Sequence, residues 1–196
     1  MAKQIKTSNG GVLRIIGGSW RGRKLNFPDV AGLRPTGDRV RETVFNWLQP
    51  FIGGSRCLDL FAGSGALGFE AASRGAAAVD MVEADSNAYR QLQSNAVLLQ
   101  AEQCQLWHKQ AQQFLLKASG PFDIVFIDPP YQSALWKEVA DLLVSRDLLS
   151  EGARIYLEFP RRQLMPGLPV QWQLLKEKQA GDVKYCLFEN QSGASE

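Results

Sequence analysis

The spacing of hydrophobic positions along this 196-residue chain changes near residue 55. Before that point, the segment VLRIIGGSWRGRKLNFP at residues 12–28 alternates between apolar and polar positions and is broken by Gly17 and Gly18. A two-residue period interrupted by glycines is typical of a hairpin. The sequence therefore predicts a small β-ribbon that carries Arg21, Arg23 and Lys24 near its turn.

A helix is predicted next, in LRPTGDRVRETVFNWL at residues 33–48. Val40, Val44 and Leu48 recur at helical spacing, so one face is apolar. Thr36 or Asp38 can cap the amino end of this helix, because both side chains accept hydrogen bonds from free backbone N–H groups.

From residue 56 onward, predicted strands and helices alternate. Strands are expected at 56–61, 78–84, 103–109, 122–127 and 154–159, helices at 66–75, 86–100, 111–118 and 134–144, and a closing hairpin at 170–179 and 183–190. Repeated βα units imply a Rossmann-like α/β fold. We expect a seven-stranded, mostly parallel sheet with helices on both faces and a C-terminal antiparallel hairpin. We divide the chain into a basic ribbon-and-helix extension (1–54), the α/β domain (55–190) and a flexible tail (191–196).

Composition narrows the class of protein. Apolar residues make up 45% and charged residues 21%, as in ordinary globular domains. No apolar run approaches the roughly 18–20 residues of a membrane helix, and the basic N-terminus lacks the apolar core of a signal peptide. We therefore expect a cytoplasmic monomer with no membrane contact. The scattered Cys57, Cys104 and Cys186 indicate reduced thiols, and with His108 as the single histidine we expect no metal.

Charge is distributed unevenly. Residues 1–54 hold nine Lys/Arg and three Asp/Glu (+6), and the rest of the chain holds thirteen and seventeen (−4). A basic arm on a slightly acidic body is typical of a nucleic-acid contact, although a solubilising surface gives the same pattern. The arm includes Arg21, Arg23, Lys24 and Arg34, which can bind RNA phosphates. Trp20 among them can stack on a base or pack on the ribbon.

The first loop of the α/β region, LDLFAGSGALGFE, is a candidate cofactor loop. Gly63, Gly65 and Gly68 fit G-x-G-x-x-G, and Glu83 follows Gly63 by 20 residues at the end of the next strand. Such glycines allow close approach of any ligand, and Glu83 can accept hydrogen bonds from two ribose hydroxyls. The pattern fits a nicotinamide dinucleotide or another adenosine-containing cofactor.

Asp59 favours one of these cofactors. It lies in the strand four residues before Gly63, where it would repel dinucleotide phosphates but attract the ammonium group of S-adenosylmethionine. The chain is also short for a dinucleotide domain plus a substrate domain. We therefore favour S-adenosylmethionine.

The segment FDIVFIDPPY at residues 122–131 carries the candidate chemistry. An apolar run typical of a buried parallel strand ends in Asp128, Pro129, Pro130 and Tyr131. In doubly wound sheets, ligands bind beyond the carboxyl ends of the strands. There Asp128 and a backbone carbonyl of the proline turn can each accept one N–H of a planar exocyclic amine. Both bonds stabilise the positive charge that develops on nitrogen during methyl transfer, and Tyr131 offers a ring for a flipped base.

Together these motifs resemble a known family. DLFAGSGALGFEAASRG followed by FIDPPY resembles class I S-adenosylmethionine-dependent methyltransferases that act on amino nitrogens. RIIGGSWRGRKL and LRPTGDRVRETVFNWL add a resemblance to the RsmD family, from about Arg14 to about Tyr185. That family methylates the N2 amine of one guanine in 16S ribosomal RNA, so the resemblance implies that substrate, within a small ribosomal subunit or an assembly intermediate.

The resemblance also implies roles for individual residues. Asp128, Pro129, Pro130 and Tyr131 would hold the target base. The cofactor would be held by Thr36 or Arg39 at its carboxylate, by Asp59, Phe61, Ala62, Gly63, Ser64 and Gly65 at the methionine part, by Glu83 and Ala84 at the ribose, and by Gln110, Ala111 and Asp128. Related enzymes often have an acidic residue at the position of Gln110, where it accepts from the adenine amine.

Three alternatives remain open on the residues alone. An enzyme acting on adenine N6 or on a protein glutamine would use the same Asp-Pro-Pro-Tyr geometry. A nicotinamide oxidoreductase predicts NADH binding. A non-catalytic RNA-binding module predicts that Asp128→Ala leaves the biological activity intact.

Two further arginines, Arg161 and Arg162, follow the fifth strand of the α/β region. They lie on the same predicted rim, formed by the carboxyl ends of the strands, and can add to the basic patch.

Overall fold

The protein is described here by a computed structural model that covers residues 10–28, 37–130 and 135–191. Two short strands, β1 (Gly11–Arg14) and β2 (Lys24–Phe27), form the predicted antiparallel ribbon. The larger sheet contains β3 (Arg56–Asp59), β4 (Ala78–Glu83), β5 (Cys104–His108), β6 (Phe122–Ile127), β7 (Leu149–Pro160), β8 (Trp172–Ala180) and β9 (Val183–Asn190). The helices are α1 (Asp38–Leu48), α2 (Ala66–Ser73), α3 (Ser86–Leu99), α4 (Ala111–Leu115) and α5 (Trp136–Ser145).

The seven strands lie in the order β5-β4-β3-β6-β7-β9-β8. Neighbours from β5 to β7 pair in parallel, whereas β9 pairs antiparallel with both β7 and β8. This confirms the predicted mostly parallel sheet and its C-terminal hairpin. The chain order reverses at β3, which lies between β4 and β6, so this is the point where a ligand is expected beyond the carboxyl ends of the strands.

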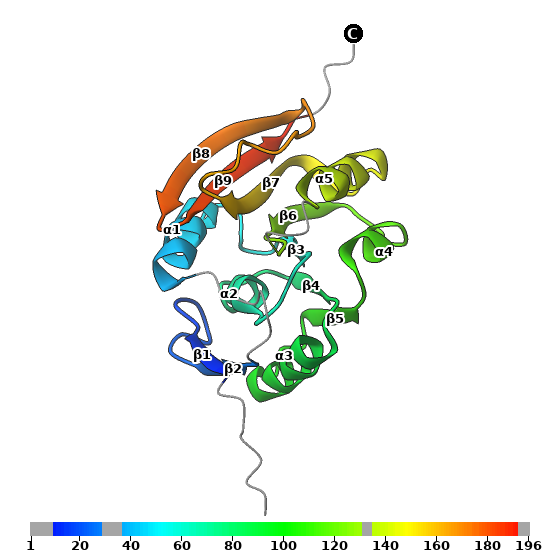
Figure 1. The fold of residues 1–196 in the computed structure, drawn as a ribbon. Coiled ribbons are helices and arrows are strands. Elements are labelled where there is room, and N and C mark those ends of the chain that lie inside the picture. The colour runs from blue at the N-terminus through cyan, green and yellow to red at the C-terminus, as the bar shows by residue number, and fades with distance from the viewer. Residues whose placement is uncertain (1–9, 29–36, 131–134, 192–196) are drawn as a thin grey trace, which may run out of the picture.

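Helices cover both faces of the sheet, with α1, α2 and α3 on one side and α4 and α5 on the other (Figure 1). The side chains of successive strand residues point to opposite faces of a sheet, so each strand contributes to both layers. Phe126 of β6 packs with the first group of helices, whereas Val125 and Ile127 pack with the second. Both faces of β6 are therefore buried, as its continuous apolar sequence predicts.

The ribbon packs directly on this body. Leu13, Ile15 and Leu25 are buried in the same core cluster as the side chains of α1 and α2. The ribbon and the sheet therefore share one hydrophobic core.

The start of α1 differs from the sequence prediction. Gly37 is the N-cap residue and provides no side-chain hydrogen bond, and Asp38 lies inside the helix as its first residue. Instead of capping, the Asp38 carboxylate accepts a 2.6 Å hydrogen bond from Arg41 one turn later. The alternative cap, Thr36, lies outside the described residues. Among the helices that the structure describes, none has the length and apolar character needed to cross a membrane.

Candidate functional site at the carboxyl edge of the sheet

The strands that carry the predicted cofactor and substrate residues are neighbours. Asp59 at the end of β3 pairs in register with Met81 of β4 and Phe126 of β6. The loop after β3, Glu83 at the end of β4 and Asp128 just after β6 therefore meet at one edge of the sheet. We call this edge, formed by the carboxyl ends of β3 to β7, the carboxyl rim.

Three glycines have structural roles in the loop after β3 and the start of α2. Gly63 and Gly65 have φ angles of +50° and +81°, in the left-handed region that favours glycine. Gly65 is also the N-cap of α2. Gly68 lies inside α2, where a Cβ atom would approach Met81 Cε to 2.5 Å. Gly68 therefore allows α2 to pack closely on β4, and the first two glycines give the loop its shape.

Glu83 holds the glycine loop from the end of β4. Its carboxylate accepts hydrogen bonds from the backbone N–H of Gly63 at 2.8 Å and of Asp85 at 2.6 Å. Burial raises the pKa of Glu83 above its ordinary value, and these hydrogen bonds oppose the shift. A carboxylate has about four acceptor positions, so acceptor capacity remains for two ribose hydroxyls. The site thus fits the ribose of an adenosine cofactor.

Asp59 is almost fully buried, with 2% of its surface exposed. Its carboxylate accepts a 3.0 Å hydrogen bond from the backbone N–H of Gly68, in the first turn of α2. Burial raises the pKa of Asp59 from 3.8 to about 7. Asp59 therefore braces the glycine loop and α2 from below, and an ammonium group bound above the loop would favour its ionised form.

The predicted adenine-side residues follow β4 and β5, which are adjacent strands with Glu83 opposite His108. Ala84 and Gln110 are exposed, and Ala111, the first residue of α4, is buried. His108 was not among the predicted site residues. It stacks on Tyr89 with ring centroids 4.8 Å apart, and its Nε2 lies 3.2 Å from the carbonyl oxygen of Ala84. The adjacency of β4 and β5 is the signal that would have placed His108 at this end of the site.

Asp128 follows the last residue of β6 and is half-buried, Pro129 is buried and Pro130 is exposed. Tyr131 lies outside the described residues. The backbone N–H of Leu60 donates to the carbonyl of Phe126 at 3.2 Å, so the β3–β6 pairing continues up to the start of both loops. Asp128 and the glycine loop are therefore fixed to the same rigid part of the sheet. Of the other predicted loop residues, Phe61 is half-buried, and Ala62 and Ser64 are buried.

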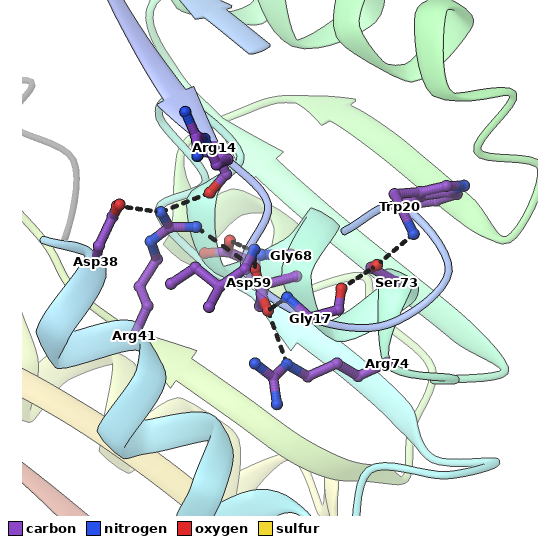
Figure 2. A network of polar contacts seen from close by, with 11 residues as sticks. Arg14, Gly17, Trp20, Asp38, Arg41, Asp59, Gly68, Ser73 and Arg74 are labelled. Atoms are coloured by element: carbon purple, nitrogen blue, oxygen red, sulfur yellow. Dashed lines mark hydrogen bonds and ion pairs between the residues drawn. The ribbon is translucent and has the colours of Figure 1, made fainter. Parts of the chain in front are cut away.

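The carboxyl end of α1 leads into the residues that begin β3, at the end of the sheet opposite the carboxyl rim. The start of α1 therefore points toward the carboxyl rim. Arg39 in its first turn is exposed, as expected for a residue facing a ligand or solvent. Thr36 and Arg34 lie outside the described residues. Figure 2 shows how this helix is tied to α2 and the ribbon through the buried side chain of Arg41.

The ribbon turn is anchored to the carboxyl ends of α2 and α3, away from the carboxyl rim. Ser73, the last residue of α2, accepts hydrogen bonds from the backbone N–H groups of Ser19 and Trp20 (Figure 2 shows the Trp20 bond), at 2.8 and 2.9 Å. Arg23 donates to the carbonyl of Leu98 in the last turn of α3, at 2.7 Å. Both helices begin at the carboxyl rim and run away from it, and the eight residues of α2 span about 12 Å.

The structure therefore does not bring the ribbon arginines to Asp128. Arg21 and Arg23 are exposed at the far edge, and exposed Lys24 lies opposite Arg14 in the ribbon. Trp20 packs as a half-buried side chain against the core cluster, which favours packing over a free stacking surface. In the part of the chain that the structure describes, no group of three or more His, Cys, Asp or Glu side chains is arranged to hold a metal ion.

Comparisons with known proteins show which family this chain resembles. The family "Conserved hypothetical protein 95" matches residues 13–189. Ribosomal RNA small subunit methyltransferase D of Escherichia coli (strain K12) is 46% identical over 190 residues, which is 97% of this chain and 96% of that protein. The solved structure of Escherichia coli yhhF has a TM-score of 0.86 and 45% identity, and the match covers 92% of this chain and 99% of that one.

A more distant structure shares the fold. An RNA methyltransferase from Salinibacter ruber, solved in complex with S-adenosyl-L-homocysteine, has a TM-score of 0.62 at 14% identity, with 83% of this chain and 97% of that chain covered. The expected resemblance is confirmed by the family match and by the identity over almost the full length of both chains. This chain belongs to the RsmD family, that of the ribosomal RNA small subunit methyltransferase D proteins.

Proposed function

We propose that this protein transfers a methyl group from S-adenosylmethionine to the exocyclic N2 amine of a specific guanine in 16S ribosomal RNA. The observation that carries the proposal is the position of Asp128 and the Pro129–Pro130 turn directly after β6, next to the glycine loop that follows β3. The family relationship supports ribosomal RNA of the small subunit as the substrate. The choice of guanine N2 rests on resemblance to the family.

The cofactor would lie along the carboxyl rim. Glu83 would bind the ribose with the acceptor capacity left after its bonds to Gly63 and Asp85. The loop from Phe61 to Gly65 would hold the methionine part above Asp59, with Arg39 at its carboxylate. Ala84, Gln110 and Ala111 would border the adenine, where the Gln110 carbonyl can accept from the adenine amine. When bound, S-adenosylmethionine supplies an electrophilic methyl group.

Asp128 would act on the target amine. The lone pair of a guanine N2 amine is delocalised into the ring, so the nitrogen is a weak nucleophile. Asp128 would accept one N–H and a carbonyl of the Pro129–Pro130 turn the other, which favours a tetrahedral nitrogen with its lone pair localised. The same two acceptors stabilise the positive charge that develops on nitrogen. The prolines restrict backbone movement, so the acceptors are preorganised.

The substrate is expected to be RNA within a small ribosomal subunit or an assembly intermediate, and the enzyme is expected to act as a monomer in the cytoplasm. The decisive experiment supplies labelled S-adenosylmethionine and purified protein to small subunits from cells that lack it, followed by nucleoside analysis. We expect the label in N2-methylguanosine of 16S RNA. Label in N6-methyladenosine or in protein would favour the alternative planar amines. Absence of any transfer together with binding of NADH would favour the oxidoreductase.

A further inference from the structure

A segment on the far side of Asp128 from β3 has the properties expected of an RNA contact. It comprises Arg161 to Met165, directly after β7, and we call it the rim segment. Because the ribbon turn is anchored at the ends of α2 and α3 far from Asp128, cations closer to the carboxyl rim are better placed to contact the RNA that surrounds the target base. In the described part of the chain, the rim segment provides two adjacent arginines at the carboxyl rim.

Strand register places the rim segment beside the reaction centre. Ile127 of β6 lies opposite Leu157 of β7, so Asp128 is level with Glu158, and the rim segment starts three residues farther along. With strands about 4.8 Å apart and about 3.3 Å per residue, the backbone at Arg161 lies roughly 11 Å from that of Asp128. The side chain of an arginine can bridge much of that distance.

A second set of contacts places the same segment over the start of α5. The indole Nε1 of Trp136 donates to the carbonyl of Glu158 at 2.8 Å, so the first residue of α5 lies against the end of β7. A Cβ atom at Gly167, just beyond the rim segment, would lie 3.9 Å from Cδ of Lys137. The rim segment therefore lies close to the first residues of α5, Trp136 and Lys137.

The backbone of the rim segment is held firmly while its side chains are exposed. The N–H of Arg161 donates to the carbonyl of Asp182 at 2.8 Å, and that of Gln163 donates to the carbonyl of Pro160 at 2.9 Å. Leu164 is 88% exposed and Met165 38% exposed. Arg161 and Arg162 are exposed, and neither forms an ion pair with another described residue. A fixed backbone presents these four side chains outward.

We propose that the rim segment contacts the ribosomal RNA that flanks the target guanine, an inference that rests on the proposed function. Arg161 and Arg162 bind backbone phosphates, and Leu164 and Met165 pack against an adjacent ribose or base. The charges favour RNA over a protein partner, because two cations that form no ion pair with a described residue lie beside the site that the target nucleotide has to enter.

The first experiment compares two doubly substituted proteins. In Arg161→Ala/Arg162→Ala, we expect the KM for small subunits to rise roughly tenfold, while kcat and the cofactor Kd change by less than about twofold. The control, Lys117→Ala/Arg146→Ala, removes the same charge from two exposed residues that follow α4 and α5 at the opposite edge. Equal effects of the two variants would mean that only overall charge matters and would overturn the proposal.

The second experiment identifies the contacted molecule directly. A photoreactive benzoylphenylalanine at position 164 is irradiated in complex with small subunits, and the same probe at the exposed Val97 of α3 serves as the control. We expect a crosslink to 16S RNA from position 164 and not from position 97. A crosslink from 164 only to a ribosomal protein would overturn the RNA contact. Failure of the wild-type enzyme to methylate subunits would instead contradict the proposed function.

Discussion

Arg41 of α1 and Glu70 of α2 form an ion pair inside the protein, with Nη1 and Oε2 3.5 Å apart and side-chain exposures of 1% and 0%. Glu70 also accepts hydrogen bonds from the backbone N–H groups of Ile16 and Gly17, both at 2.8 Å, and from Arg74 at 2.7 Å. One carboxylate thus joins the ribbon, α1 and α2. Because α2 begins at the glycine loop, this pair fixes the start of α1 relative to the cofactor site.

Removing the Glu70 carboxylate should therefore destabilise the whole fold. Glu70→Ala removes the buried partner of the Arg41 guanidinium and leaves only the exposed carboxylate of Asp38 beside it. Loss of a buried partner typically costs about 3–5 kcal/mol of unfolding free energy. Glu70→Gln keeps an acceptor of similar shape, so a smaller loss is expected. Chemical denaturation measures both. The control is Lys137→Ala, which breaks an exposed pair with Asp141 and should cost less than about 1 kcal/mol. A loss in Glu70→Ala no larger than in this control would contradict the prediction.

The fold was predictable because its signals are local. The change from two-residue alternation to repeated strand and helix units predicts the sheet, and the apolar run before Asp128 predicts the strand at its centre. The pairing of Arg41 with Glu70 could not be predicted, since the residues are 29 positions apart and each looks like an ordinary exposed charge on a helix. Asp38 was misread as a cap for a related reason, because its partner Arg41 is revealed only when α1 is packed.

The candidate site was predictable only for residues that the strand order brings together. Asp59, Glu83 and Asp128 lie at the ends of adjacent strands, so their proximity follows from topology. The prediction that Arg21 and Arg23 bind RNA phosphates rests on charge alone, and the hydrogen bonds of the ribbon turn to α2 and α3 place the turn far from Asp128. The distribution of charge along a sequence does not show at which end of the strands a charged segment lies.

The buried Asp59 should make stability depend on pH. Its pKa is raised from 3.8 to about 7, so between these values the folded protein holds a proton that the unfolded chain has released. The free energy of unfolding should therefore fall as pH rises from about 4 to about 7, and this contribution should be constant above that range. The difference between wild type and Asp59→Asn in denaturation at several pH values isolates it.

Cofactor binding should alter this dependence. An ammonium group near Asp59 favours the ionised carboxylate and lowers its pKa, so saturating S-adenosylhomocysteine should shift the loss of stability to lower pH. The same measurement on Asp59→Asn is the control, because that side chain does not titrate. An unchanged pH dependence with ligand bound to the wild type would show that the ammonium group does not interact with Asp59.

Substitution of Asp128 should separate catalysis from cofactor binding. Asp128→Ala removes the acceptor for the target amine but leaves the bonds of Glu83 and Asp59 intact. We expect the cofactor Kd to stay close to that of the wild type and kcat to fall by roughly 10²–10³-fold, as when a preorganised acceptor or donor is lost elsewhere. Calorimetry and single-turnover methyl transfer test the two parts. Transfer within a few-fold of wild type would refute the assigned role, and would instead fit a non-catalytic RNA-binding module.

Glu83 should show the converse behaviour. Its carboxylate holds Gly63 and Asp85 and is proposed to bind the ribose, so Glu83→Gln replaces an ionised acceptor by an amide with one acceptor oxygen. A hydrogen bond to a charged group contributes about 1.5–3 kcal/mol, so the cofactor Kd should rise roughly 10–100-fold. At saturating cofactor, kcat should remain within a few-fold of wild type, because Asp128 and the proline turn are unchanged. Asp85→Asn is the matched control, since its side chain caps α3 through bonds to Asn87 and Ala88 and lies outside the proposed ribose contact. Equal losses of affinity in the two variants would indicate that the loop had merely become disordered, whereas a loss confined to Glu83→Gln would identify the ribose contact.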